Sequence, residues 1–226
     1  MKYIFLSILF SILLSTRGVF ADEKTALRYV ALGDSYTIGT GVELEFSWPS
    51  VMTKQLNEKG IPVQLITNLA VNGFTAQEVL SIELPIYKEL KPDFATLLVG
   101  ANDWVQGVEP DQFRTRLTQL MDELLKDLPN KDHLLIVTIP DFGVTPKGPQ
   151  FSVGRDIAKG ISEFNAIIKE EAKKRKLTVV DIFPLSQECA KDPAMISADG
   201  LHPSEKGYAA WEKNIYPAAE KILKEK

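Results

Sequence analysis

Two residues near the C-terminus have the types and the spacing of a catalytic base and its partner. Asp199 lies three residues before His202. An offset of three residues closes one turn, so the carboxylate can accept a hydrogen bond from Nδ1–H of the imidazole and leave Nε2 as a proton acceptor. A nearby serine hydroxyl can then act as a nucleophile. A polar turn that caps the last helix would also explain the segment 199–203.

Ser35 is the serine whose surroundings fit that role. It follows the apolar run 29–32 and precedes a helical pattern, a place where serine also often serves as a helix cap. Asn102 and Gly73 follow other apolar runs and offer a side-chain NH2 and a backbone N–H to an oxyanion. Taken alone, each of these two is more typical of an ordinary turn. Together, the residues are those of nucleophilic acyl transfer.

These residues must be positioned by the elements between them. Five short runs rich in Val, Ile and Leu are apolar on both faces, which is typical of strands covered by helices on both sides. The alternation of strand and helix predicts right-handed crossovers, a five-stranded parallel sheet and a three-layer α/β/α sandwich. The predicted strands are residues 29–32, 63–67, 94–99, 134–139 and 178–182.

The intervening segments carry helix signals. Thr75 and Glu78 form a capping box, and Gly60 ends a helix predicted over 49–59. Pro110 opens an apolar stripe with helical spacing. Two further helices are predicted, one from residue 157 to the basic end at 173–176 and one from Ser204 onward.

The carboxyl ends of parallel strands share one edge of the sheet, and ligands bind outside that edge. His133 precedes the fourth apolar run, so it is expected at the opposite edge, outside the site. Polar loops that carry Ser35, Asn102 and His202 are expected on the binding edge. These loops are residues 33–37, 68–73, 100–103, 140–143 and 199–203.

Taken in order, the polar blocks resemble those of the SGNH (GDSL-type) hydrolases. The blocks are Gly33-Asp34-Ser35, Gly73, Gly100-Ala101-Asn102-Asp103 and Asp199-Gly200-Leu201-His202-Pro203. Trp48-Pro49 follows the first block at a similar distance, and the chain looks closest to the bacterial thioesterase/lysophospholipase-like esterases. Tyr36-Thr37 and Ala101 depart from the pattern, which bears on the pocket walls more than on the chemistry.

The resemblance implies a flavodoxin-like sheet and a serine hydrolase that cleaves carboxylic esters through an acyl-enzyme. It implies Ser35 as nucleophile, His202 as base and Asp199 as the partner that orients the base. The oxyanion hole would comprise the N–H groups of Ser35 and Gly73 and the Asn102 side chain. No metal and no organic cofactor is required.

Apolar residues in or beside the loops of the site edge are expected to bind the substrate, although they could instead pack those loops onto the core. The candidates are Trp48, Trp104, Phe142 and Leu201. The stretch 141–154, with its Gly and Pro residues, is expected to form a movable flap. An acetyl ester, a lysophospholipid and a thioester all remain open as substrates.

Composition excludes several other classes of protein. The chain has 226 residues, with 26 basic and 30 acidic residues, one Cys and two His. A single Cys excludes a disulfide framework and a Cys-based zinc cluster, and two His exclude most multi-His metal sites. A formal charge of −4 gives no electrostatic footprint for nucleic acid. The expected partner is a small acyl ester, and the expected state is a monomer.

The first residues are typical of a secretory signal peptide. Lys2 is followed by an apolar stretch of about a dozen residues and a small-residue end at Ala21. The stretch is shorter than the roughly 20 apolar residues of a membrane-spanning helix. We therefore expect a signal peptide over 1–21, one hydrolase domain over 22–226, export to the periplasm or the medium, and no stable membrane insertion.

Two other classes of function compete with the esterase interpretation. A flavin- or phosphate-binding protein is one, because residues 35–40 loosely resemble a flavodoxin phosphate loop. It leaves Asn102 and the pair of Asp199 and His202 unexplained, and a purified protein without yellow colour would exclude it. A catalytically silent carbohydrate-binding relative is the other, and the complete set of Ser35, Asp199 and His202 argues against it.

Overall fold

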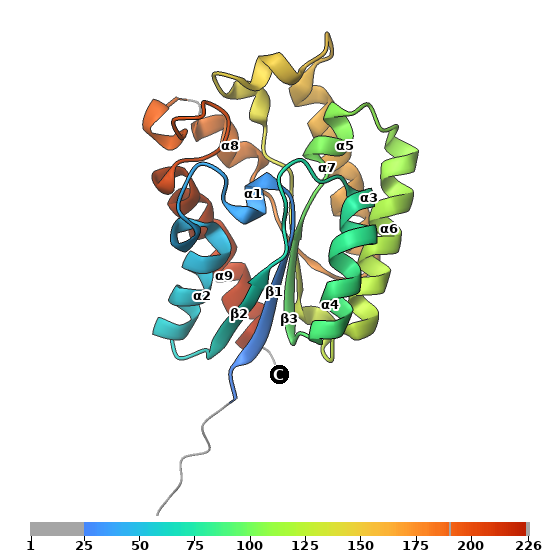
Figure 1. The fold of residues 1–226 in the computed structure, drawn as a ribbon, viewed down its shortest axis with the longest axis vertical. Coiled ribbons are helices and arrows are strands. Elements are labelled where there is room, and N and C mark those ends of the chain that lie inside the picture. Colours follow the sequence, from blue (N-terminus) through green and yellow to red (C-terminus); the bar gives the residue numbers. More distant parts are fainter. Residues whose placement is uncertain (1–24, 190, 225–226) are drawn as a thin grey trace, which may run out of the picture.

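The structure, a computed structural model, describes residues 25–189 and 191–224 (Figure 1). At its centre lies a parallel sheet with the strand order β2-β1-β3-β4-β5. The strands are β1 Leu27–Gly33, β2 Val63–Asn68, β3 Phe94–Leu98, β4 Leu134–Val137 and β5 Thr178–Val180. Each overlaps a run predicted from the sequence, so the predicted five-stranded parallel sheet is confirmed. The predicted signal peptide over 1–21 lies outside the described residues and stays a prediction.

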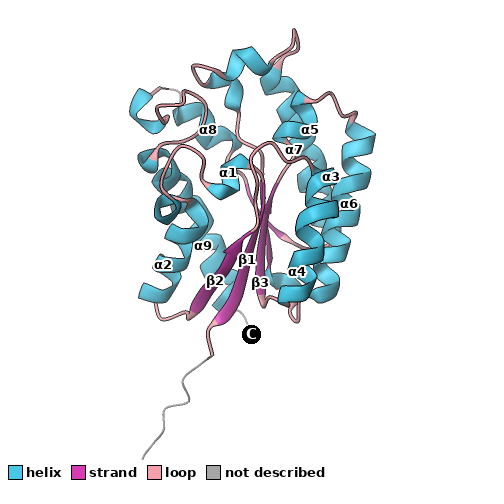
Figure 2. Ribbon diagram, in the orientation of Figure 1, coloured by secondary structure: helices cyan, strands magenta, loops and turns pink. Residues whose placement is uncertain are grey.

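Helices cover both faces of this sheet (Figure 2). Helices α2 and α9 pack together on one face, whereas α4, α6 and α7 cover the other. Their bounds are α2 Trp48–Glu58, α4 Leu84–Leu90, α6 Pro110–Asp127, α7 Ile157–Lys174 and α9 Glu205–Lys224. The predicted three-layer architecture is therefore confirmed. Among the described residues, none of the helices combines the length and the apolar character that crossing a membrane requires.

Shorter helical segments lie near the strand ends. The short α-helices are α1 Ser35–Ile38, α3 Ala76–Glu78, α5 Ala101–Val105 and α8 Phe183–Cys189. The 3-10 turns are Leu44–Phe46, Lys131–His133, Phe142–Val144, Gly148–Phe151 and Pro193–Met195. Both hydrogen bonds of the predicted capping box are present at the start of α3. A π-helical turn, Val79–Glu83, continues α3 into α4.

The two central strands position the candidate site. Every residue of β3 is buried, as are the last five residues of β1, because helices cover the sheet on both sides. Tyr29 of β1 stacks on Phe94 of β3, and its hydroxyl lies 2.8 Å from that of Thr96. Strand β1 leads directly into Ser35, and β3 leads into Asn102, so this rigid pair of strands fixes both loops.

Candidate active site

The histidine and aspartate near the C-terminus form a close pair. Nδ1 of His202 lies 2.6 Å from Oδ2 of Asp199, the contact that their three-residue offset predicts. His202 is 8 % exposed, so its ring is largely enclosed by protein. A carboxylate at Nδ1 holds the imidazole in the tautomer whose Nε2 is free to take a proton.

Asp199 is held by three further donors on its other oxygen. Oδ1 accepts hydrogen bonds from the Leu201 N–H at 2.7 Å, the His202 N–H at 2.9 Å and the Ser197 hydroxyl at 2.8 Å. Partial burial works against the charge, but these bonds and the His202 ring outweigh it and keep the pKa of Asp199 well below its ordinary value. The carboxylate is therefore charged at neutral pH. Sequence reasoning missed Ser197, whose only signal is its place two residues before Asp199.

Ser35 is the first residue of α1, directly after the turn that ends β1. Asp34 caps this helix, because its Oδ1 accepts the Tyr36 N–H at 3.0 Å. The Tyr36 ring packs against the His202 ring with 5.1 Å between centroids and against Trp211 with 5.9 Å. The cap and these ring contacts fix the backbone on both sides of Ser35.

Asn102, in the first turn of α5, brings a side-chain amide to the same place. Its Nδ2 donates to the Phe74 carbonyl oxygen at 3.0 Å. An amide nitrogen carries two hydrogens, so one bond to Phe74 leaves a second donor. Behind Asn102, the buried Asp103 accepts the Ala76 N–H at 2.8 Å and ties α5 to the start of α3.

Gly73 lies between the segments that carry Ser35 and Asn102. The residue before it, Asn72, accepts a hydrogen bond from the Thr40 hydroxyl at 2.5 Å, just beyond α1. The residue after it accepts the Asn102 amide. Gly73 has a φ of +83°, which favours glycine, and the space where a Cβ would stand is open.

One pocket brings the predicted catalytic residues together. Its empty volume is about 300 Å³. Ser35, Asn102 and His202 lie in its wall. Gly73 is not part of the lining, but its chain neighbours Asn72 and Phe74 are hydrogen-bonded to Thr40 and Asn102. The remaining lining residues are Tyr36, Ala101, Val105, Phe142, Phe151 and Leu201. Tyr36 and Ala101, the departures from the family pattern that were expected to bear on the pocket walls, both lie in this lining.

The predicted substrate-binding residues divide into two pairs. Phe142 and Leu201 line the pocket, as expected. Trp48 does not: it is fully buried at the start of α2, where Nε1 donates to the Tyr36 carbonyl oxygen at 3.1 Å. Trp104 is also absent from the pocket wall, because it lies between α5 and α7 with the Arg155 guanidinium 4.0 Å from its ring centroid. Both tryptophans support the residues that line the pocket.

A second cavity adjoins the first. It has an empty volume of about 290 Å³ and shares Tyr36, Phe142 and Leu201 with the catalytic pocket. Its far wall includes Trp211, Met195 and Ile196. The polar side chains in its lining are already hydrogen-bonded: Ser186 and Thr145 donate to backbone oxygens, and Asp141 accepts from the Gly143 N–H and the Gln187 amide. An apolar chain therefore suits this space better than a polar ligand.

The other features of the sequence lie away from the pocket. The 3-10 turn that ends at His133 precedes β4, and Nδ1 of His133 lies 2.9 Å from the Asp93 carbonyl oxygen, at the edge opposite the site. Within the described ranges, no three His, Cys, Asp or Glu side chains are grouped so that they could hold a metal ion. The stretch 141–154 forms two 3-10 turns and lines the pocket through Phe142 and Phe151.

Comparison with known proteins places this site in a family. The model of the GDSL-like Lipase/Acylhydrolase family matches residues 31–210. "Thioesterase 1/protease 1/lysophospholipase L1" of Escherichia coli (strain K12) is 25% identical over 200 residues, which cover 88% of this chain and 84% of that protein. The arylesterase of Vibrio mimicus is 26% identical over 184 residues, 81% of this chain and 83% of the relative.

Solved structures share the fold. The crystal structure of TesA has a TM-score of 0.69 and 22% sequence identity, and the match covers 86% of this chain and 99% of that one. The esterase EstA from Pseudoalteromonas, inhibited by monoethylphosphonate, has a TM-score of 0.67 and 20% identity, with 87% and 98% covered. Since the family model spans most of the chain, the protein belongs to the GDSL-like lipase/acylhydrolase family and is an ester-hydrolysing enzyme.

Proposed function

We propose that the enzyme hydrolyses acyl esters through a Ser35, His202 and Asp199 triad and a covalent acyl-enzyme. One observation carries this proposal: Ser35, Asn102 and His202 line a single pocket, and the His202 ring is held by Asp199 at 2.6 Å. A nucleophile, a base with an orienting carboxylate and a donor for an oxyanion are the groups that acyl transfer needs.

The reaction has two similar halves. Ser35 Oγ attacks the carbonyl carbon while Nε2 of His202 takes the hydroxyl proton, and the electron pair of the C=O bond moves onto its oxygen. The N–H groups of Ser35 and Gly73 and the Asn102 amide stabilise this oxyanion. The intermediate collapses, the bond to the alcohol breaks, and His202 gives its proton to the leaving oxygen. Water then attacks the acyl-enzyme in the same way and releases the acid and free Ser35.

The walls of the pocket bear on the substrate. Val105, Phe142 and Phe151 make the catalytic pocket apolar beyond the reacting atoms. The adjoining cavity behind Tyr36 and Leu201 would lengthen the apolar space if these side chains moved. Acyl groups are therefore the part of the substrate that this side receives. The names of the relatives, a thioesterase/lysophospholipase and an arylesterase, keep thioesters, lysophospholipids and aryl esters as the classes to assay.

The test compares the full chain with Ser35→Ala on p-nitrophenyl esters from acetate to palmitate. We expect Ser35→Ala to lower kcat by about 10³- to 10⁶-fold. Ser162→Ala, which changes an exposed serine on α7, is the matched control and should keep the activity. Activity that survives in Ser35→Ala would remove the serine from the mechanism. A fluorophosphonate probe that labels wild type but not Ser35→Ala would separate a demanding substrate from a silent site.

A further inference from the structure

A buried glutamate that the proposed mechanism does not use lies beneath the nucleophile. Glu83 is 1 % exposed, and its Oε2 accepts the Gly33 N–H at 3.0 Å. It is the last residue of the π-helical turn Val79–Glu83, in which the Leu84 N–H bonds to the Val79 carbonyl oxygen. Such turns carry one residue more than an α-helical turn and are frequent at functional sites. Here the turn brings a carboxyl group to the backbone just before Ser35.

Gly33 is a position where the backbone needs support. Its φ is +146°, and a Cβ there would stand 2.0 Å from the Leu98 carbonyl oxygen, so only glycine fits. Its carbonyl oxygen accepts the Val71 N–H at 3.4 Å, a long hydrogen bond. Of these two hydrogen bonds to Gly33, the one to Glu83 is the shorter, at 3.0 Å against 3.4 Å for the one from Val71. Both partners belong to the chain segment after β2. The peptide that Glu83 holds is two residues before the nucleophile.

The charges around Glu83 explain why its protonation state matters. Asp34 is fully buried next to Ser35, and its Oδ2 has no hydrogen-bond partner among the described residues. The other charged groups near this cluster are Asp103 on α5, Glu78 on α3 and Arg116 on α6, whose guanidinium lies 3.5 Å from Asp103.

Burial, reinforced by the Asp34 charge and opposed by the Gly33 N–H, raises the pKa of Glu83 to about 9. At neutral pH Glu83 is therefore the neutral acid, which accepts the N–H without adding a charge beneath the oxyanion.

We propose that Glu83 is a positioning residue of the esterase: by accepting the Gly33 N–H, it fixes the turn that presents the Ser35 hydroxyl and N–H to the substrate. The inference rests on the proposed function in one respect, the role of Ser35 as nucleophile. Glu83 itself does not touch the substrate, since it is absent from the lining of the catalytic pocket.

The test uses two pairs of variants. Glu83→Leu removes the acceptor at similar size, whereas Glu83→Gln keeps an oxygen for Gly33. Glu212 on α9 offers the matched control: it is fully buried and is not hydrogen-bonded within the described chain, and burial alone raises its pKa to about 9 as well. We expect Glu83→Leu to lower kcat by about 10- to 100-fold with KM within about threefold, because small displacements of a reacting group have effects of this size. Glu83→Gln, Glu212→Leu and Glu212→Gln should stay within about threefold of wild type.

A pH profile gives a readout that a packing role would not change. Wild-type kcat should fall as the pH passes about 9, because a charged Glu83 opposes the negative oxyanion, and Glu83→Gln should lose this fall. Equal losses of kcat in Glu83→Leu and Glu212→Leu would overturn the proposal. An unchanged alkaline fall in Glu83→Gln would do the same, and this measurement holds even if Glu83→Leu does not fold.

Failure of the proposed function has a different signature. In that case wild type neither hydrolyses esters nor reacts with a fluorophosphonate at Ser35. Hydrogen exchange of the Gly33 amide then still decides whether Glu83 holds the turn. Exchange that is about tenfold faster in Glu83→Leu than in Glu212→Leu supports the positioning role, and equal exchange contradicts it.

Discussion

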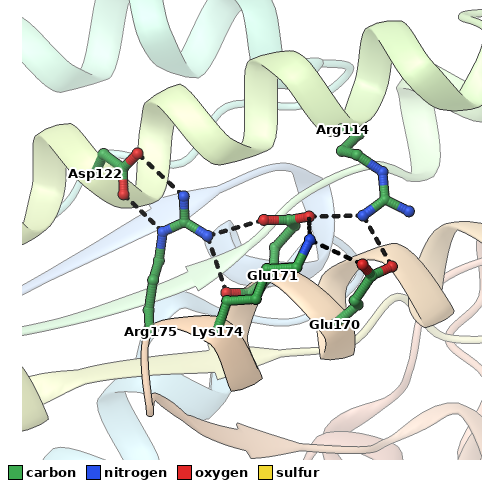
Figure 3. A network of polar contacts seen from close by, with 6 residues as sticks. All are labelled: Arg114, Asp122, Glu170, Glu171, Lys174 and Arg175. Atoms are coloured by element: carbon green, nitrogen blue, oxygen red, sulfur yellow. Dashed lines mark hydrogen bonds and ion pairs between the residues drawn. The ribbon is translucent and has the colours of Figure 1, made fainter.

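Carboxylates occur in two opposite environments in this enzyme. One is the seam between α6 and α7, and the other is the buried sheet edge around Ser35, the proposed catalytic edge. In the seam, Glu171 accepts hydrogen bonds from Arg114 at 2.6 Å, Lys174 at 2.8 Å and Arg175 at 2.9 Å (Figure 3). Arg175 also binds both oxygens of Asp122. Burial opposes the charge of Glu171, yet these three cations lower its pKa to about 2.

Two buried carboxyl groups beside Ser35, those of Asp34 and Glu83, have backbone partners in place of cations. Asp34 accepts the Tyr36 N–H, Glu83 accepts the Gly33 N–H, and each keeps one oxygen without a partner in the described chain. Burial raises the pKa of Asp34 to about 7 and that of Glu83 to about 9. The same functional group therefore stabilises the fold in the seam, while at the edge it shapes the backbone around Ser35 and is not fully stabilised itself. We expect mutations in the seam to change stability and mutations at the edge to change kcat.

The largest effect should come from Asp199, the edge carboxylate that contacts His202, the proposed base. Asp199→Asn replaces the oxygen that faces Nδ1 of His202 and so loses the tautomer that leaves Nε2 free. We expect kcat to fall by about 10⁴-fold. Asp192→Asn, in the 3-10 turn region of the same loop, is the control and should keep kcat within about threefold. A comparable loss in both variants would assign the effect to loop folding.

Asn102→Ala should follow, with a loss of about 10²- to 10³-fold that falls mostly on kcat. The reason is that an oxyanion donor is used in the transition state and little in the bound substrate. Asn214→Ala, at an exposed position of α9, should leave both constants unchanged. Steady-state kinetics on p-nitrophenyl acetate measures both variants, and a loss of only a few-fold for Asn102→Ala would contradict its assigned role.

The seam should show the reverse pattern. Glu171→Ala removes the acceptor shared by three cations, and we expect the free energy of unfolding to fall by about 1–3 kcal/mol while kcat stays unchanged. Glu171 has a lowered pKa in the folded state, so its contribution is present above pH 4.5 and is lost as the pH falls toward 2. Urea unfolding at pH 7 and pH 3 measures both. Glu170→Ala, half exposed in the same network, should lose less; a larger loss there would contradict the central place of Glu171.

The sequence predicted the sheet and most of the site because their signals are local. Runs that are apolar on both faces predict strands covered by helices on both sides of the sheet. The three-residue offset of Asp199 and His202 spans one turn and so predicts their contact. Trp48 and Trp104 could not be placed in this way, since an aromatic residue beside a binding loop packs equally well toward the ligand or toward the core. Contacts with residues distant in the sequence fix their positions: Trp48 donates to the Tyr36 carbonyl oxygen, and the Trp104 ring packs against the Arg155 guanidinium.

Glu83 shows a second reason why sequence reasoning stops short. A helical pattern predicts the direction of this side chain only if the helix is regular, and the π-helical turn Val79–Glu83 contains one residue more than an α-helical turn. Its partner is 50 residues away at the end of β1. Neither the extra residue in the turn nor the long-range contact has a signature in composition or spacing.

The slope of stability with pH separates the two environments most directly. Glu212 on α9 has the raised pKa of the catalytic edge without a role in the site, so it isolates the effect of burial. Between pH 4.5 and about 9 the unfolded chain releases this proton while the folded protein keeps it, so stability falls as the pH rises, by at most about 1.4 kcal/mol per pH unit. Glu212→Gln should remove this decline and gain on wild type from pH 5 to pH 8. Glu171→Ala should instead lie below wild type by a constant amount above pH 4.5 and approach it as the pH falls toward 2. Parallel curves for Glu212→Gln and wild type would show that Glu212 is charged in the folded state, and burial alone would then not distinguish the catalytic edge from the seam.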